Sequence, residues 1–120
     1  MEYMLQIYSD ETRWPQMTAD EVKYWMGAYT AFGKALVEAG AYVDSNRLEP
    51  TATATRVSVA PDGKTTVLDG PYADTKEQLG GYFIIEAPDL DAALTWAARC
   101  PGASHGTVEV RPILAVPAAV

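Results

Sequence analysis

The segment 18–39 constrains the fold most, because it has the pattern of one long amphipathic helix. Thr18 precedes Glu21 by three positions, which is the spacing of a capping box at a helix start. Helical spacing relates a set of mostly apolar positions, namely Val22, Trp25, Met26, Tyr29, Phe32, Gly33, Leu36 and Val37. Gly40 suits the left-handed position that ends many helices. The stripe predicts a helix that faces the core.

Strands and a shorter helix are predicted on both sides of that helix. Aromatic, β-branched or alternating apolar residues indicate strands at 3–8, 41–46, 53–60, 64–68, 82–86 and 106–111. Asp89 can cap a second helix, which ends at the Cys-Pro-Gly segment 100–102. The Pro-Asp-Gly turn 61–63 makes a hairpin of the strands beside it, and 69–81 is predicted to be a polar, glycine-bearing loop.

The order of these elements predicts an α+β fold. Without the hairpin it is β-α-β-β-α-β, which is the ferredoxin-like arrangement. Both helices then cover one face of an antiparallel sheet. Because residues 82–85 are apolar on both sides of their strand, we expect a second copy of the chain to cover the other face, as a homodimer. The length fits a single domain, 1–120, with a flexible tail at about 114–120.

Charge and cysteine usage argue against several classes of protein. The formal net charge of −7 disfavours non-specific nucleic-acid binding. Cys100 is the one cysteine, so no internal disulfide is expected, and its place at a helix end favours packing over nucleophilic chemistry. The start of the chain has no basic region and no long apolar run, so a cytoplasmic location is expected. No phosphate-binding loop, zinc spacing or calcium loop is present, so we expect no cofactor and no metal.

The segment 69–81 resembles the signature of DGPF-type proteins within the YCII-related family. It reads Asp-Gly-Pro-Tyr-Ala-Asp-Thr-Lys-Glu-Gln-Leu-Gly-Gly, with Tyr72 and Asp74 where Phe and Glu are usual. The likeness covers nearly the whole chain, including the segments 3–8, 98–101 and 108–113. The resemblance implies a dimeric α+β barrel. It implies little about activity, although some relatives are encoded beside, or fused to, extracytoplasmic-function sigma factors.

Two side chains bear on acid–base chemistry. Relatives in the wider YCII group carry a His–Asp pair that is proposed to be catalytic. Counted from Gly40, that histidine falls near Tyr29, so the resemblance does not carry the pair over to this chain. Tyr29 either belongs to the helix's apolar stripe or places its hydroxyl in a pocket. His105, the only histidine, is expected to be a solvated turn residue rather than a proton shuttle.

Charged residues in and near 69–81 form the predicted site. Asp69 ends a strand beside a glycine and is the candidate general base, and the alternative is an Asx turn. A charged constellation is expected to hold a substrate carboxylate, from Asp69, Asp74, Lys76, Glu77 and Arg111. The alternative is a salt-bridge network that fixes the loop on the last strand. Arg56 is expected to face solvent or pair across the hairpin, unless it faces Asp69.

Three hypotheses for function follow. The first is a small-molecule-binding protein or enzyme that acts by acid–base chemistry on a small organic acid. In that case Asp69 is catalytic, and the binding residues are Tyr29, Arg56, Lys76, Glu77 and Arg111. The second is a regulatory module that binds another protein, which rests on the resemblance alone. The third is a non-catalytic structural dimer.

Overall fold

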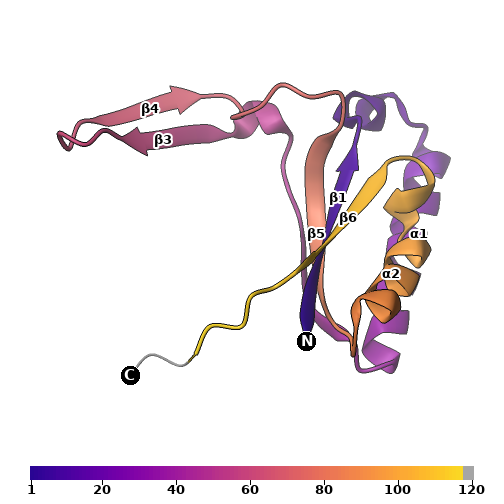
Figure 1. Ribbon diagram of the computed structural model, residues 1–120. Helices are drawn as coiled ribbons and strands as arrows, with labels where there is room; N and C mark the ends of the chain where they lie inside the picture. Colours follow the sequence, from indigo (N-terminus) through magenta and orange to yellow (C-terminus); the bar gives the residue numbers. More distant parts are fainter. Residues whose placement is uncertain (118–120) are drawn as a thin grey trace.

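The computed structural model describes residues 1–117, in which an antiparallel sheet carries two helices on one face and a hairpin projects beyond it (Figure 1). The strands are β1 (Glu2–Ser9), β2 (Tyr42–Arg47), β3 (Thr55–Val59), β4 (Thr65–Asp69), β5 (Gln78–Glu86) and β6 (Thr107–Pro112). The helices are α1 (Ala19–Glu38), α2 (Leu90–Arg99) and the short 3-10 helices η1 (Glu11–Gln16), η2 (Thr51–Thr53) and η3 (Pro101–Ser104). The sheet order β2-β5-β1-β6 confirms the ferredoxin-like prediction.

The predicted helix signals act as expected. The Glu21 amide donates to Thr18 Oγ1 at 3.1 Å, and the Thr18 amide donates to Glu21 Oε1 at 3.3 Å, which completes the capping box. Gly40 follows α1 with φ of +70°, a conformation that glycine adopts without steric cost. Asp89 caps α2 by accepting a hydrogen bond from the Ala92 amide at 2.8 Å. Both helices are therefore positioned by local sequence.

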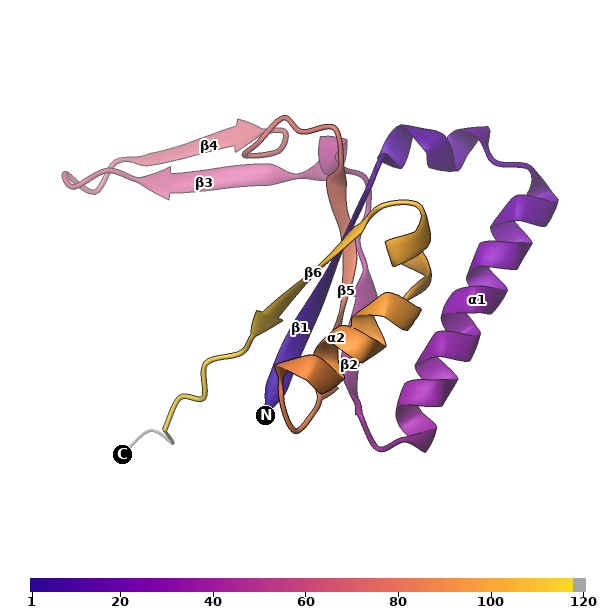
Figure 2. The same ribbon diagram turned by 45° about the vertical axis from the view of Figure 1, so that its right-hand side comes forward.

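The core lies between the two helices and one face of the sheet (Figure 2). Its buried members are Tyr3, Leu5, Ile7, Phe32, Leu36, Ala41, Phe83, Ile85, Ala87, Ala93, Ala97 and Cys100. Alternation along β5 buries Phe83 and Ile85 and turns Tyr82 and Ile84, both half-buried, to the opposite face. The predicted two-sided apolar character of this strand is confirmed, and no helix of residues 1–117 lies over its second face (Figure 1).

The hairpin of β3 and β4 forms an arm that extends away from the sheet on the side opposite the helices (Figure 1). Val57 and Val67 face each other across the arm and are 65% and 59% exposed. An isolated two-stranded hairpin is at best marginally stable in water. The arm thus exposes apolar side chains that the other residues of 1–117 leave uncovered.

The prediction of a loop over 69–81 is wrong for its last four residues, because residues 78–81 belong to β5. The glycine pair at 80–81 favours a loop in the sequence, yet Gly81 pairs with Ile7 of β1 and with Arg47 of β2. A Cβ on Gly81 would lie 2.7 Å from the Asn46 carbonyl oxygen, so only glycine lets the two backbones approach this closely. Part of the predicted flexible tail, residues 118–120, lies outside the described residues.

Candidate functional site

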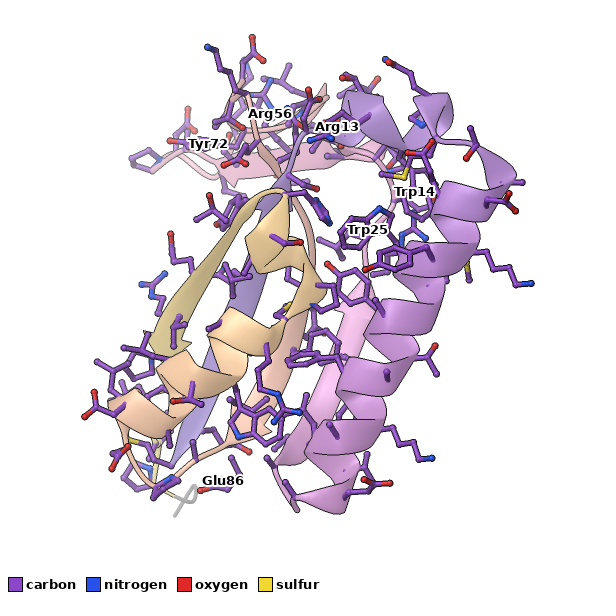
Figure 3. All side chains as sticks on the ribbon, turned by 90° about the vertical axis from the view of Figure 1, so that its right-hand side faces the viewer. Arg13, Trp14, Trp25, Arg56, Tyr72 and Glu86 are labelled. Atoms are coloured by element: carbon purple, nitrogen blue, oxygen red, sulfur yellow. The ribbon has the colours of Figure 1, made fainter. Side chains whose placement is uncertain are left out.

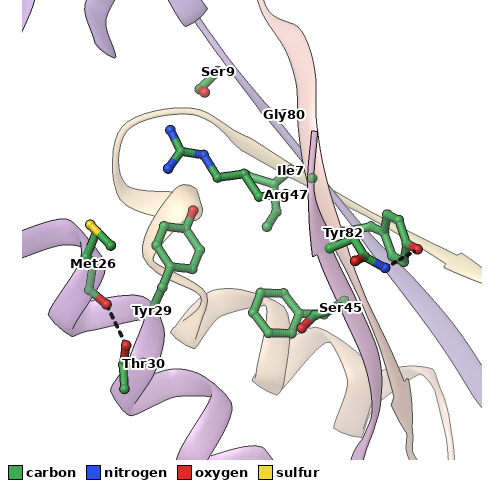
Figure 4. A pocket seen from close by; sticks show the side chains of 12 residues that line it. Ile7, Ser9, Met26, Tyr29, Thr30, Ser45, Arg47, Gly80 and Tyr82 are labelled. Carbon is green, nitrogen blue, oxygen red and sulfur yellow. Dashed lines mark hydrogen bonds between the residues drawn. The ribbon is translucent and has the colours of Figure 1, made fainter. Parts of the chain in front are cut away.

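A pocket of about 470 Å³ opens between α1 and the sheet edge formed by β2 and β5 (Figure 4). It is lined by Ile7, Ser9, Met26, Tyr29, Thr30, Ser45, Asn46, Arg47, Gly80, Gly81, Tyr82 and Phe83. Its volume falls in the range of ordinary small-molecule sites. Most of the wall is apolar, and a few side chains contribute polar groups. Ligand-binding sites use such groups to orient the ligand.

Three polar side chains from three elements meet at one end of the pocket. The guanidinium of Arg47 from β2, the hydroxyl of Tyr29 from α1 and the hydroxyl of Ser9 from β1 all point toward this end (Figure 4). The positive charge of Arg47 acts on the Tyr29 phenol, in keeping with this closeness. A guanidinium flanked by two hydroxyls is suited to bind a carboxylate.

The glycines at 80–81 make room for this arrangement. Arg47 is the register partner of Gly81 across β2 and β5. Both glycines line the pocket. Because neither has a side chain, β5 leaves space next to Arg47. The strand irregularity beside Ile7 and Tyr8 lies next to the same glycines.

Arg47 is held by an aromatic ring and has no carboxylate partner in the described part of the chain. Its Cζ lies 3.9 Å from the ring centroid of Trp14, a cation–π contact. Within residues 1–117, the ion pairs join the Met1 ammonium to Glu86 and Lys34 to Glu38. The charge of this exposed arginine is therefore available to a ligand.

Tyr29 is a proton donor in this pocket rather than a base. Burial raises its pKa, and the nearby thiol of Cys100 adds to the effect. Its ring stacks on Phe83 with centroids 6.4 Å apart. Burial also raises the pKa of the Cys100 thiol, whose side chain is 2% exposed. At neutral pH both groups keep their protons, and the Tyr29 hydroxyl can donate to a ligand oxygen.

The other predicted site residues lie elsewhere. Asp69 ends β4 with an exposed side chain, and register places it on the opposite face of the arm from Arg56. Lys76 is exposed in the segment before β5, and Arg111 sits in β6 opposite Met4. Glu77 accepts a hydrogen bond from the Thr107 hydroxyl at 3.0 Å, which ties its segment to β6.

Of the predicted catalytic and binding residues, Tyr29 alone lines the pocket. The others are Arg56, Asp69, Lys76, Glu77 and Arg111. Among residues 1–117 no ion pair joins the charged residues of 69–77 to Arg111. The alternative prediction is a salt-bridge network that fixes the loop on the last strand. The contact of this kind that the structure shows is the hydrogen bond between Glu77 and Thr107. The catalytic role of Asp69 stays a prediction.

Sequence reasoning missed Arg47 and Ser9. Arg47 lies one residue beyond the predicted strand 41–46, and nothing in its neighbours marks it as a ligand-binding residue. The signal that could have found the pocket is the glycine pair directly before an apolar strand. Such glycines often mark a close approach of another backbone or of a ligand.

Residues 1–117 contain neither a cluster of metal-ligating side chains nor a helix that could span a membrane. In the described residues, no group of three or more His, Cys, Asp and Glu side chains is placed to hold a metal ion. None of the helices within 1–117 combines the length and apolar character that a membrane span requires.

Comparisons with known proteins agree on the family. A profile of the YCII-related domain matches residues 1–117. An uncharacterised protein of Rhizobium meliloti (strain 1021) is 37% identical over 115 residues, which covers 94% of this chain and 92% of the relative. Neither match names an activity or a ligand, so the enzymatic and the regulatory hypotheses stay predictions. The chain belongs to the YCII-related family.

Proposed function

We propose that this protein binds a small organic acid in the pocket between α1 and the β2–β5 edge. Arg47 binds the carboxylate of the acid, with the hydroxyls of Tyr29 and Ser9 beside it. The observation that carries the proposal is the meeting of these three side chains at one end of a pocket whose wall is mostly apolar (Figure 4). The apolar body of the acid lies against Ile7 and Phe83.

The chemistry of the pocket favours binding over acid–base catalysis by its own wall. The lining residues include no Asp, Glu or His side chain. Tyr29 retains its proton because burial raises its pKa. A catalytic base would have to come from outside this wall, and Asp69 remains the candidate that the sequence offers.

The proposal predicts that Arg47→Gln weakens the binding of short monocarboxylates, such as valerate and hexanoate, at least tenfold. Losing a charge-assisted hydrogen bond of this kind costs roughly 1.5–3 kcal/mol. Isothermal titration calorimetry measures the change. Arg99→Gln is the matched control, because it removes the same charge from a side chain that lies over the Trp96 ring instead.

Two outcomes of that titration count against the pocket. One is equal affinity of Arg47→Gln and the unaltered protein. The other is loss of binding in Asp69→Asn with full binding in Arg47→Gln, which would move the site to the predicted constellation.

We propose in addition that two copies pair through the uncovered face of the sheet. Half-buried side chains gather on that face, namely Met4, Gln6, Tyr8, Tyr82 and Ile84. The arm extends from the same side of the sheet (Figure 1), so a second copy on this face also meets the arm. A two-fold pair would cover both elements in both copies.

The pairing predicts that Ile84→Lys converts a dimer into a monomer, because a charge in the centre of an apolar interface is left unpaired. Sedimentation equilibrium gives the mass of each species. Val37→Lys, on a side chain of α1 that is 61% exposed, is expected to leave the dimer intact. A monomeric unaltered protein at micromolar concentration would refute the pairing.

A further inference from the structure

The pocket continues past Arg47 into a second, smaller hollow. This hollow has a volume of about 160 Å³ and lies among η1, residues 47–50 and His105. Ser9, Arg47 and Gly80 line both hollows, so the guanidinium of Arg47 stands at their boundary. A ligand held at Arg47 can therefore extend in two directions.

Basic side chains gather around the smaller hollow. Arg13, Arg47 and His105 all line it, which is the only histidine and two of the nine Lys and Arg residues of the chain. Arg13 and His105 both line this hollow, and the pKa of His105 is lowered by burial and then by the positive charge of Arg13. Three acidic residues line the same hollow, namely Asp10, Glu11 and Glu49.

Aromatic rings hold two of these basic groups in place. Trp14 stacks on Arg47, and the ring of Trp25 lies edge-on to His105 with centroids 4.2 Å apart. Arg13, Trp14 and Trp25 lie at the same end of the molecule (Figure 3). The hollow is thus built mainly by η1, by the end of β2 with the residues after it, and by the turn after η3, and Trp25 of α1 supports His105 from behind the lining.

Two of the three acidic residues that line the hollow, Asp10 and Glu11, accept hydrogen bonds from neighbouring groups. Asp10 accepts from the amide and the hydroxyl of Thr12, at 3.0 and 2.6 Å. Glu11 accepts from the amide of Thr51 at 3.0 Å and from its hydroxyl, and Glu49 is exposed. Across residues 1–117, none of these carboxylates forms an ion pair with either arginine.

We propose that the smaller hollow binds a second acidic group of the same ligand, so that the site takes a small dicarboxylate. Arg47 binds one carboxylate, and Arg13 binds the other beside His105. This inference rests on the proposed function, because it extends the ligand that Arg47 holds. It also specifies the ligand, because Arg13 and Arg47 line the same hollow and each can bind one carboxylate.

The test compares acids of equal chain length by isothermal titration calorimetry: glutarate with valerate, and adipate with hexanoate. For the unaltered protein, we expect at least one dicarboxylate to bind about tenfold more tightly than its monocarboxylate. Arg13→Gln is expected to reduce that ratio to about twofold or less, with the monocarboxylate affinity unchanged. Arg99→Gln, the control of equal charge, is expected to keep the full ratio.

The outcomes separate this inference from the proposed function. If monocarboxylates bind through Arg47 but no dicarboxylate binds more tightly, the second hollow has no such role and the proposed function stands. An unchanged ratio in Arg13→Gln overturns the assignment of Arg13. If neither class of acid binds, both proposals fail together.

Discussion

Replacing Leu36 with alanine should lower the free energy of unfolding by about 2–5 kcal/mol. Leu36 is fully buried in the layer between α1 and the sheet, so its loss removes apolar contacts and leaves a cavity. The whole stability of a domain this size is about 5–15 kcal/mol. Urea denaturation, followed by circular dichroism, measures the change through the midpoint.

The neighbouring position provides the control. Val37→Ala, at a side chain that is 61% exposed, is expected to change the free energy of unfolding by no more than about 0.5 kcal/mol. A loss of similar size in both variants would contradict the assignment of the helix face.

Replacing Gly102 with alanine is expected to cost about 1–3 kcal/mol of stability, because the added methyl group overpacks the site. Its Cβ would lie 2.6 Å from Ile7 Cγ2 and 2.8 Å from the Tyr29 hydroxyl oxygen. Both neighbours line the pocket, so they must shift to make room. The variant should therefore also bind monocarboxylates more weakly, which calorimetry measures beside the urea midpoint.

Gly27→Ala is the matched control for this substitution. Gly27 lies on the exposed side of α1, and a Cβ there meets no atom within 4 Å. Alanine is the better helix former, so this variant is expected to gain up to about 1 kcal/mol. If Gly102→Ala is as stable as the unaltered protein and binds equally well, the close packing at Tyr29 is refuted.

The fold could be predicted because its signals are local. Thr18, Glu21 and Gly40 bound α1 by hydrogen bonding and backbone conformation, which depend on nearby residues only. Helical spacing alone did not separate buried from exposed positions, since Leu36 and Val37 both fit the stripe and only the first is buried. That difference depends on how α1 rests on the sheet.

The pocket could not be predicted in the same way, because it is assembled from distant segments. Ser9, Tyr29 and Arg47 come together only when β2 pairs with β5 and α1 crosses over that edge. In contrast, the charged segment 69–77 is conspicuous in the sequence. In the structure it directly follows the hairpin of β3 and β4, which projects from the sheet (Figure 1). A dense local pattern is therefore a weaker guide to this site than the glycine pair at 80–81.

The most direct test of the pocket is to map where an acid binds by heteronuclear NMR. Valerate and glutarate are titrated into ¹⁵N-labelled protein, and the backbone amide shifts are followed. Binding in the pocket predicts the largest changes at Ser9, Arg47 and the glycines 80–81. Changes confined to residues 69–77 and Arg111, or no changes with either acid at millimolar concentration, would contradict it.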